Sequence, residues 1–404
     1  MLTARGRWAL GLGLAVYLTA WAFGSKPLYP VALGLLLAVA LAWAWVRLTS
    51  GPMRLRRRVQ SGKDYFEGAD VPVELELEVE SAFRPRCALV VQRIAKLGER
   101  ITVLERSAGT LRARLVLQAV PRGRYAFDDA RALVEDPFGL EQAEALVAGG
   151  GALLVYPRLV DLGPLFSESG TQLPEGRLLL LRRPSGFDFH SVREYEQGES
   201  LRRVHWRTTA RRGQLMVKEL EDAPRDEVAV VLDASTSSVA GSPPDSSFDA
   251  RVRVAGSLLQ AHVRRGRRAA LAVNDVALQT LRVASSDGDW RRALELLASV
   301  EPTGRTPVAA LLADEGSVAA RALELTVVTS ELSKGLVDRL IQRVLARRSC
   351  SLVYVDPDSF GPASERHREP ALLRLQAAGV PVAVVRRGDD LAEALGSRRL
   401  AAHG

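Results

Sequence analysis

Two long apolar runs open the chain. Residues 8–23 and 28–46 contain no charged side chain, and the short break between them includes Lys26 and Pro27. A helix rises about 1.5 Å per residue and the hydrocarbon core of a bilayer is about 30 Å thick, so runs of this length predict membrane-spanning helices. A cleaved signal peptide fits less well because the second run follows at once. The pattern therefore predicts a transmembrane helical hairpin over residues 1–50.

Apolar and charged residues then alternate strictly over residues 71–80, which places Val73, Leu75 and Leu77 on one face and glutamates on the other. This period of two is typical of a half-buried strand. Similar short runs separated by turn residues follow at residues 88–94, 100–105, 111–119 and 152–156. Strands at this spacing predict a small antiparallel β-sandwich over residues 51–160.

A different pattern begins at residues 227–233, a continuous apolar run of the kind that parallel sheets bury on both faces. Strand-like and helix-like runs alternate from there to the end. The expected strands lie at residues 269–273, 278–283, 323–329, 351–355 and 380–385, and the expected helices at residues 248–264, 290–299, 335–346 and 370–378. Such alternation predicts a doubly wound α/β domain over residues 226–404, with residues 161–225 as a connector.

Positive charge is concentrated in two stretches. Residues 47–63 contain six basic residues and no acid, and residues 177–218 contain ten basic and four acidic residues, although the formal charge of the whole chain is only +8. A uniformly basic surface is therefore not implied, and aromatic residues that could stack on bases are scarce. We expect no nucleic-acid partner.

Basic residues also flank the apolar runs. Arg5 and Arg7 precede the first run and the 47–63 group follows the second. Because positive flanks stay on the cytoplasmic side, the chain is expected to be a multi-pass protein of the cytoplasmic membrane with its soluble domains in the cytoplasm. The lipid membrane is then one partner. The 47–63 group either contacts anionic lipid headgroups or serves only as a topology signal.

The connector contains the densest run of charged, aromatic and histidine residues outside the N-terminus, at residues 186–211. Its distinctive positions are Gly186, Phe187, Arg193, Glu194, Tyr195, Gly198, Glu199, Arg202, His205, Trp206, Arg207, Ala210 and Arg211. In order and spacing they resemble the signature of the bacterial domain-of-unknown-function 58 family, and residues 121–125 and 136–140 resemble the same family. The acids and arginines suit a buried or interdomain ion-pair network that docks the domains, with Tyr195 and Trp206 as apolar anchors. Binding of an acidic segment or a phosphate is the alternative.

The strand at residues 227–233 ends in an Asp-x-Ser-x-Ser motif formed by Asp233, Ser235 and Ser237. With the α/β pattern around it, this motif resembles a von Willebrand factor A-like domain. The resemblance implies that the three side chains, with Thr306, give oxygen ligands to Mg²⁺ or Mn²⁺. The second aspartate of that fold is missing, and Ser330 and Glu331 stand in its place. The alternative is that the same side chains only cap the following loop or helix.

These patterns favour a non-enzymatic, membrane-anchored interaction protein. The family resemblance implies a MoxR-type AAA+ ATPase as partner and a role in assembling envelope proteins. The chain contains no HExxH, Gly-x-Ser-x-Gly or P-loop motif. A hydrolase or metal-dependent enzyme built on His190, Glu194 and His205 is the alternative, and a purely structural scaffold, in which Asp233 merely ends a strand, is a third.

Overall fold

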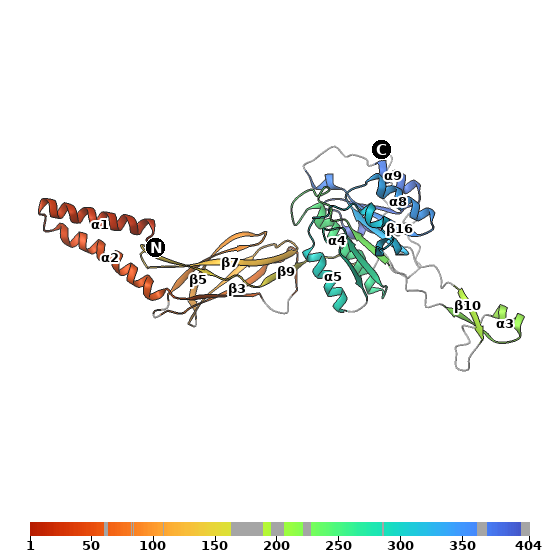
Figure 1. Cartoon of the computed structure of the whole chain (residues 1–404), viewed down its shortest axis with the longest axis horizontal. Coiled ribbons are helices and arrows are strands. Elements are labelled where there is room, and N and C mark those ends of the chain that lie inside the picture. The colour runs from red at the N-terminus through yellow and green to blue at the C-terminus, as the bar shows by residue number, and fades with distance from the viewer. Residues whose placement is uncertain are drawn as a thin grey trace. The chain divides into compact units, whose positions relative to one another are not determined.

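The computed structural model describes residues 1–59, 64–81, 83, 85–107, 109–162, 189–194, 206–220, 228–284, 287–361 and 370–396. The chain forms two compact units, Met1–Tyr156 and Pro157–Gly404. Figure 1 colours their elements in chain order. The first unit contains two helices and a curled sheet, and the second contains a mostly parallel sheet with helices on both faces.

Two helices begin the first unit. Helix α1 spans Ala4–Phe23 and helix α2 spans Leu28–Thr49, and they pack side by side (Figure 1). A Cβ atom placed on Gly13 would lie 3.2 Å from Leu35 Cβ, so the glycine allows a close approach of the two helices. Among the described helices, α2 alone is long and apolar enough to cross a membrane. Most of its leucines are exposed, which is unfavourable in water and supports membrane association.

Nine strands of the described residues form one sheet in the order β1-β3-β6-β5-β4-β7-β9-β2, with β8 paired to β7. Their bounds are β1 Met53–Val59, β2 Tyr65–Phe66, β3 Val71–Val79, β4 Cys87–Ile94, β5 Gly98–Ser107, β6 Thr110–Leu117, β7 Gly123–Glu135, β8 Gln142–Val147 and β9 Ala152–Tyr156. The sheet curls over one apolar core to which Val73, Leu75 and Val90 belong. The expected sandwich is therefore a single curled sheet, antiparallel except where β2 meets β9.

Strand β7 is the longest of these strands, yet the sequence pattern does not predict it. Phe127 and Ala130 are both buried, whereas Asp128 and Asp129 between them are exposed. The pairing of β7 with β4 shifts register at this point, as in a β-bulge. A bulge adds one residue to a strand and breaks its period of two, which hides the strand from a search for alternation.

The second unit contains a sheet whose described strands follow the order β14-β13-β12-β15-β16-β17, parallel except for the edge strand β14. The strands are β12 Val228–Leu232, β13 Ala269–Val273, β14 Thr280–Val283, β15 Glu324–Thr329, β16 Ser349–Val355 and β17 Val382–Val385. All five residues of β12 are buried. This strand lies at the centre because it is apolar on both faces, as expected for a parallel sheet covered on both sides.

Helices cover both faces of this sheet. Val228, Val230 and Leu232 of β12 belong to one core with α4 Ser247–Arg264, α5 Asp287–Ser299 and α10 Leu391–Gly396. Ala229 and Val231 belong to the opposite core. That core includes α6 Val308–Ala313, α7 Val318–Arg321, α8 Lys334–Leu345 and α9 Pro370–Ala377. A short 3-10 helix, η3, spans Pro357–Phe360. The mixed α/β class predicted from the sequence is confirmed.

Part of the predicted connector forms a small element of its own. Strands β10 Phe189–Glu194 and β11 Met216–Leu220 pair antiparallel, and α3 Trp206–Arg212 lies between them in sequence. Helix α3 buries none of its side chains, and Trp206 is 65% exposed. The role of Trp206 as an apolar anchor in a buried or interdomain ion-pair network stays a prediction, because a seven-residue helix with several arginines presents no continuous apolar face of its own.

Candidate functional site

The side chains expected to bind a metal ion lie together at the carboxyl edge of the second sheet. Asp233, Ser235 and Ser237 follow β12, Thr306 precedes α6, and Glu331 follows β15. All five line one hollow of about 210 Å³. In open α/β sheets, ligands bind at this carboxyl edge because the loops that follow the strands meet there.

The carboxylate of Asp233 is buried and hydrogen-bonded at both oxygens. Oδ1 accepts from Ser235 N at 3.0 Å and from Asn274 Nδ2 at 2.9 Å. Oδ2 accepts from the Thr329 hydroxyl at 2.6 Å. Because these neighbours follow or end β12, β13 and β15, Asp233 joins the ends of three adjacent strands. The sequence search missed Asn274 and Thr329, although their positions at strand ends mark this same edge.

Arg251 of α4 places a positive charge behind Asp233. Its side chain is fully buried, and Nη1 lies 2.7 Å from the Asp233 carbonyl oxygen and 3.5 Å from Asp233 Oδ2. Burial lowers the pKa of the guanidinium to about 10, although the nearby charges of Asp233 and Glu331 act in the opposite direction. Arg251 therefore remains charged at neutral pH. Removing one member of such a buried pair leaves the other charge uncompensated, which is strongly destabilising.

Glu331 brings a second carboxylate to the hollow. Ser237 Oγ donates to Glu331 Oε2 at 2.6 Å and lies 2.7 Å from Ser235 Oγ. Ser330, by contrast, is buried and does not line the hollow. Of the two residues that stand in place of the missing aspartate, Glu331 is the one that reaches the other oxygen atoms.

Gly304 holds the loop before α6 against the strand ends. Its amide donates to Ala234 O at 2.8 Å. A Cβ atom on this residue would lie 2.1 Å from Asn274 O, so a larger residue cannot take this position without a shift of the backbone. Asn274 Nδ2 also donates to Thr306 O at 3.0 Å. These contacts fix the loop that carries Thr306.

The oxygen atoms of the hollow suit a hard divalent cation. Mg²⁺ and Mn²⁺ prefer carboxylate, hydroxyl and water oxygens, and the hollow offers Ser235, Ser237, Thr306 and Glu331. In the part of the chain that the structure describes, no three His, Cys, Asp or Glu side chains form a group that could hold a metal ion. Hydroxyl oxygens would therefore supply most of the protein ligands, and Arg251 offsets part of the negative charge.

The predicted docking residues are only partly within the described structure. Trp206, Arg207 and Arg211 lie on α3 and are exposed. The backbone of Arg193 lies on β10, and its side chain is not described. The remaining positions fall outside the described residues: Gly186, Phe187, Tyr195, Gly198, Glu199, Arg202 and His205.

The residues of the enzyme alternative lie only partly within the described chain. His190 and Glu194 both lie on β10. Residues in a regular strand rise about 3.3 Å each, so the backbone positions of these two residues lie up to about 13 Å apart, and the pairing of β10 shifts register at His190. His205 lies outside the described residues. The strand geometry therefore gives no support to a metal site at this pair.

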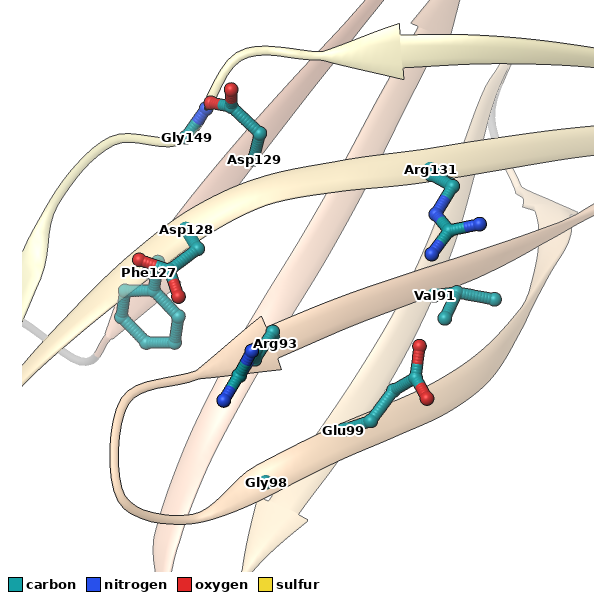
Figure 2. A pocket seen from close by; sticks show the side chains of 9 residues that line it. All are labelled: Val91, Arg93, Gly98, Glu99, Phe127, Asp128, Asp129, Arg131 and Gly149. Atoms are coloured by element: carbon teal, nitrogen blue, oxygen red, sulfur yellow. The ribbon is translucent and has the colours of Figure 1, made fainter.

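A second and wider hollow opens on the curled sheet of the first unit. Figure 2 shows Arg93, Glu99 and Arg131 around it, with Asp129 turned toward Gly149. The Asp129 carboxylate accepts a hydrogen bond from Gly149 N at 2.6 Å. Opposite charges are mixed along its wall, and none of the predicted site residues lines it. We therefore take the hollow at Asp233 as the candidate site.

Fold and site together define a mixed α/β protein with an apolar N-terminal helix and an oxygen-lined hollow at a sheet edge. Residues 191–357 match the family model described as "Protein of unknown function DUF58". The chain is also similar to the uncharacterized protein YeaD of Bacillus subtilis (strain 168), with 25% identity over 222 residues that cover 55% of this chain and 54% of that protein. The chain thus spans about half the length of this relative.

A solved structure also aligns with part of the chain. It is that of BslA, a bacterial hydrophobin, with 14% identity and a TM-score of 0.17 over 26% of this chain and 100% of that chain. A score this low says nothing about the fold of either unit.

Proposed function

We propose that this chain is a membrane-anchored, non-enzymatic protein-interaction protein whose folded units face the cytoplasm. In this proposal α1 and α2 cross the membrane together as a hairpin. The exposed apolar surface of α2 supports the anchor. Arg5 and Arg7 before the first apolar run and Arg47 after the second support the cytoplasmic orientation.

The second unit acts, in this proposal, as a von Willebrand factor A-like binding domain. The observation that carries it is the convergence of Asp233, Ser235, Ser237, Thr306 and Glu331 on one hollow at the carboxyl edge of the sheet. The hydroxyls and Glu331 hold Mg²⁺ or Mn²⁺, and Asp233 fixes the loop through its hydrogen bonds. A hard cation held by few charged ligands keeps an affinity for a further carboxylate, which the partner supplies.

The partner proposed is a MoxR-type AAA+ ATPase, as the family resemblance implies, and the process is assembly of envelope proteins. The polar hollow supports a partner that presents an acidic side chain. An acidic side chain bound through a cation would make the complex depend on free divalent metal, and chelation would then release the partner.

Mn²⁺ binding to the purified full chain in detergent tests the metal site. We expect measurable binding by calorimetry, and a loss of affinity of about tenfold or more in both variants: Glu331→Gln replaces a charged carboxylate ligand by a neutral amide, and Ser237→Ala removes a hydroxyl ligand. Glu295→Gln is the matched control, since Glu295 lies on α5, does not line the hollow, and has its carboxylate 3.8 Å from Arg291 of the same helix. This control should bind Mn²⁺ as the wild type does.

Two results would count against the proposal. If the wild-type protein binds no Mn²⁺, the proposed metal site does not exist. If the wild type, Glu331→Gln and Ser237→Ala bind Mn²⁺ equally, the metal binds elsewhere. Capture of the ATPase that is unchanged by a chelator and by Glu331→Gln would remove the metal-bridged contact.

A further inference from the structure

Two phenylalanines of the first unit have rings exposed to water, which is unfavourable for apolar surface. Phe83 is 59% exposed and Phe138 is 75% exposed. Removing a large apolar side chain from water is favourable, so two such rings mark a surface that another apolar phase can cover.

Both rings lie on segments that are bonded directly to the helix ends. Phe83 N donates to Leu48 O, near the end of α2, at 3.1 Å. Phe138 lies in the turn between β7 and β8. Thr3, which caps α1, donates from its hydroxyl to Gly139 O in this turn at 2.6 Å and from its amide to Leu140 O at 3.0 Å.

The turn that carries Phe138 is rigid. Both oxygens of the buried Asp136 carboxylate accept backbone hydrogen bonds, from Phe138 N at 2.8 Å, Leu140 N at 2.6 Å and Glu141 N at 2.7 Å. A Cβ atom placed on Gly6 of α1 would lie 2.0 Å from Leu140 O, so helix and turn are in direct contact. Phe138 is therefore held at the level of the first turn of α1.

Arginines and tryptophans surround the same helix ends. Arg5 and Arg7 are exposed in the first turns of α1, next to the exposed Trp8. Arg47, in the last turn of α2, lies with its guanidinium 5.5 Å from the centre of the Trp43 ring. Aromatic rings beside basic residues are typical of the layer where lipid headgroups meet the acyl chains.

We propose that Phe83 and Phe138 insert into this layer of the bilayer, so that the curled sheet contacts the lipid surface directly as well as through the helices. The inference rests on the proposed membrane anchoring. The occupant is a bilayer with anionic headgroups, because the rings are flanked by arginines and lie where the helices leave the sheet. Two insertion points, one beside the start of α1 and one beside the end of α2, fix the sheet against the membrane instead of leaving it on a flexible tether.

Site-specific labels on the full chain test the inference. In a background of Cys87→Ser and Cys350→Ala, single variants Phe83→Cys, Phe138→Cys, Leu37→Cys and Phe66→Cys carry an environment-sensitive fluorophore in phosphatidylethanolamine–phosphatidylglycerol vesicles. Leu37 is an exposed residue of α2 and reports anchoring. Phe66 is a 43% exposed phenylalanine of β2, which is separated from β7 by β9. It lies level with Gly123 at the start of β7, about 40 Å along that strand from Glu135.

We expect the labels at Phe83 and Phe138 to emit at shorter wavelength, to be quenched by doxyl lipids and to be shielded from iodide. The label at Phe66 should show the reverse. Lipid quenching at Leu37 with aqueous behaviour at Phe83 and Phe138 would overturn this inference and leave the anchor intact. Aqueous behaviour at Leu37 as well would overturn both. All four positions are exposed, and circular dichroism of each labelled protein confirms that the fold is kept.

Discussion

Burial keeps His262 of α4 uncharged. Its side chain is fully buried, and burial lowers its pKa from 6.5 to about 3, with the positive charges of Arg267 and Arg265 acting in the same direction. Arg267 Nη1 lies 3.2 Å from His262 Nδ1, a geometry in which Nδ1 is the acceptor and the ring is neutral. The native state therefore resists protonation of this histidine in mild acid.

His262 should make the second unit sensitive to acid. Between pH 6.5 and about 3 the unfolded chain binds a proton on this histidine and the native state does not, so the free energy of unfolding falls as the pH is lowered through this window. At pH 5 the loss amounts to about 2 kcal/mol. In His262→Gln the loss between pH 7.5 and pH 5 should be smaller by about this amount, as measured by urea unfolding at both pH values. An equal loss in both proteins would show that His262 is protonated in the native state.

Some residues of the candidate site belong to a motif that can be recognised in the sequence, and others do not. Asp233, Ser235 and Ser237 stand in one short motif, and a motif keeps its spacing when it folds. Arg251 is contributed by a helix 18 residues further on, and only its place on the apolar face of α4, beside Phe248, distinguishes it from a surface arginine. Glu331 was one of two candidates, because neighbouring residues at a strand end point in different directions until the loop geometry is known.

At the scale of elements, one arginine links the edge strand β1 of the first sheet to the strands that the curl brings opposite it. Arg57 lies on β1, on the same face as Leu55 and Val59, which pack against the core. Its Nε donates to Gln92 Oε1 at 3.2 Å, Nη1 to Ala148 O at 3.3 Å and Nη2 to Asp128 O at 3.3 Å. Burial lowers the pKa of this guanidinium. The side chain thus replaces the backbone bonds that β1 does not make with β7 and β8.

The other arginines of β1 have a different environment. Arg54, Arg56 and Arg58 are exposed on the outer face and pair with glutamates of β3 across the sheet, in the pairs Arg54–Glu80, Arg56–Glu78 and Arg58–Glu76 at 3.9, 3.4 and 4.0 Å. These three arginines are therefore balanced within the sheet and add little to a lipid-binding cluster, whereas Arg47 lies beside Trp43 at the end of α2.

Replacing Arg57 by Met should destabilise the first unit by about 2 kcal/mol, because the variant loses three hydrogen bonds and leaves their acceptors without this donor. Arg56→Met is the matched control: it lies on the same strand but is exposed, and its ion pair with Glu78 should contribute about 0.5 kcal/mol or less. Denaturant unfolding followed by far-ultraviolet circular dichroism measures both. Equal effects of the two substitutions would show that Arg57 does not link β1 to the strands opposite it.

The elements that the sequence pattern predicts are those with an uninterrupted period. The strand β3 alternates without a break, and β12 is apolar throughout, so both were predicted. The strand β1 was not, because arginine occupies an inward position at Arg57 and the charge pattern looks like a membrane flank. The pairing of distant strands, such as β12 between β13 and β15, depends on contacts across the whole unit that no local pattern contains.

At the scale of the whole molecule, each unit has its own apolar core. A fragment of residues 157–404 is therefore expected to fold alone and to unfold in one cooperative transition. Calorimetry and near-ultraviolet circular dichroism check this, with the transition of the same unit in the full chain as reference. A fragment that shows no cooperative transition would mean that the second unit needs the first in order to fold.

The sheet of the first unit ends at β1 in hydrogen-bond order. An edge strand offers free amide and carbonyl groups to any other strand, and this is a common start of aggregation. In a membrane-anchored protein, copies share one plane and meet edge to edge far more often than molecules free in solution. Arg54, Arg56 and Arg58 would then face the same charges on a second copy, while Arg57 holds the inner side of this edge to Ala148 and Asp128. Under the proposed membrane anchoring, the stretch that follows α2 therefore disfavours pairing of two copies through this edge.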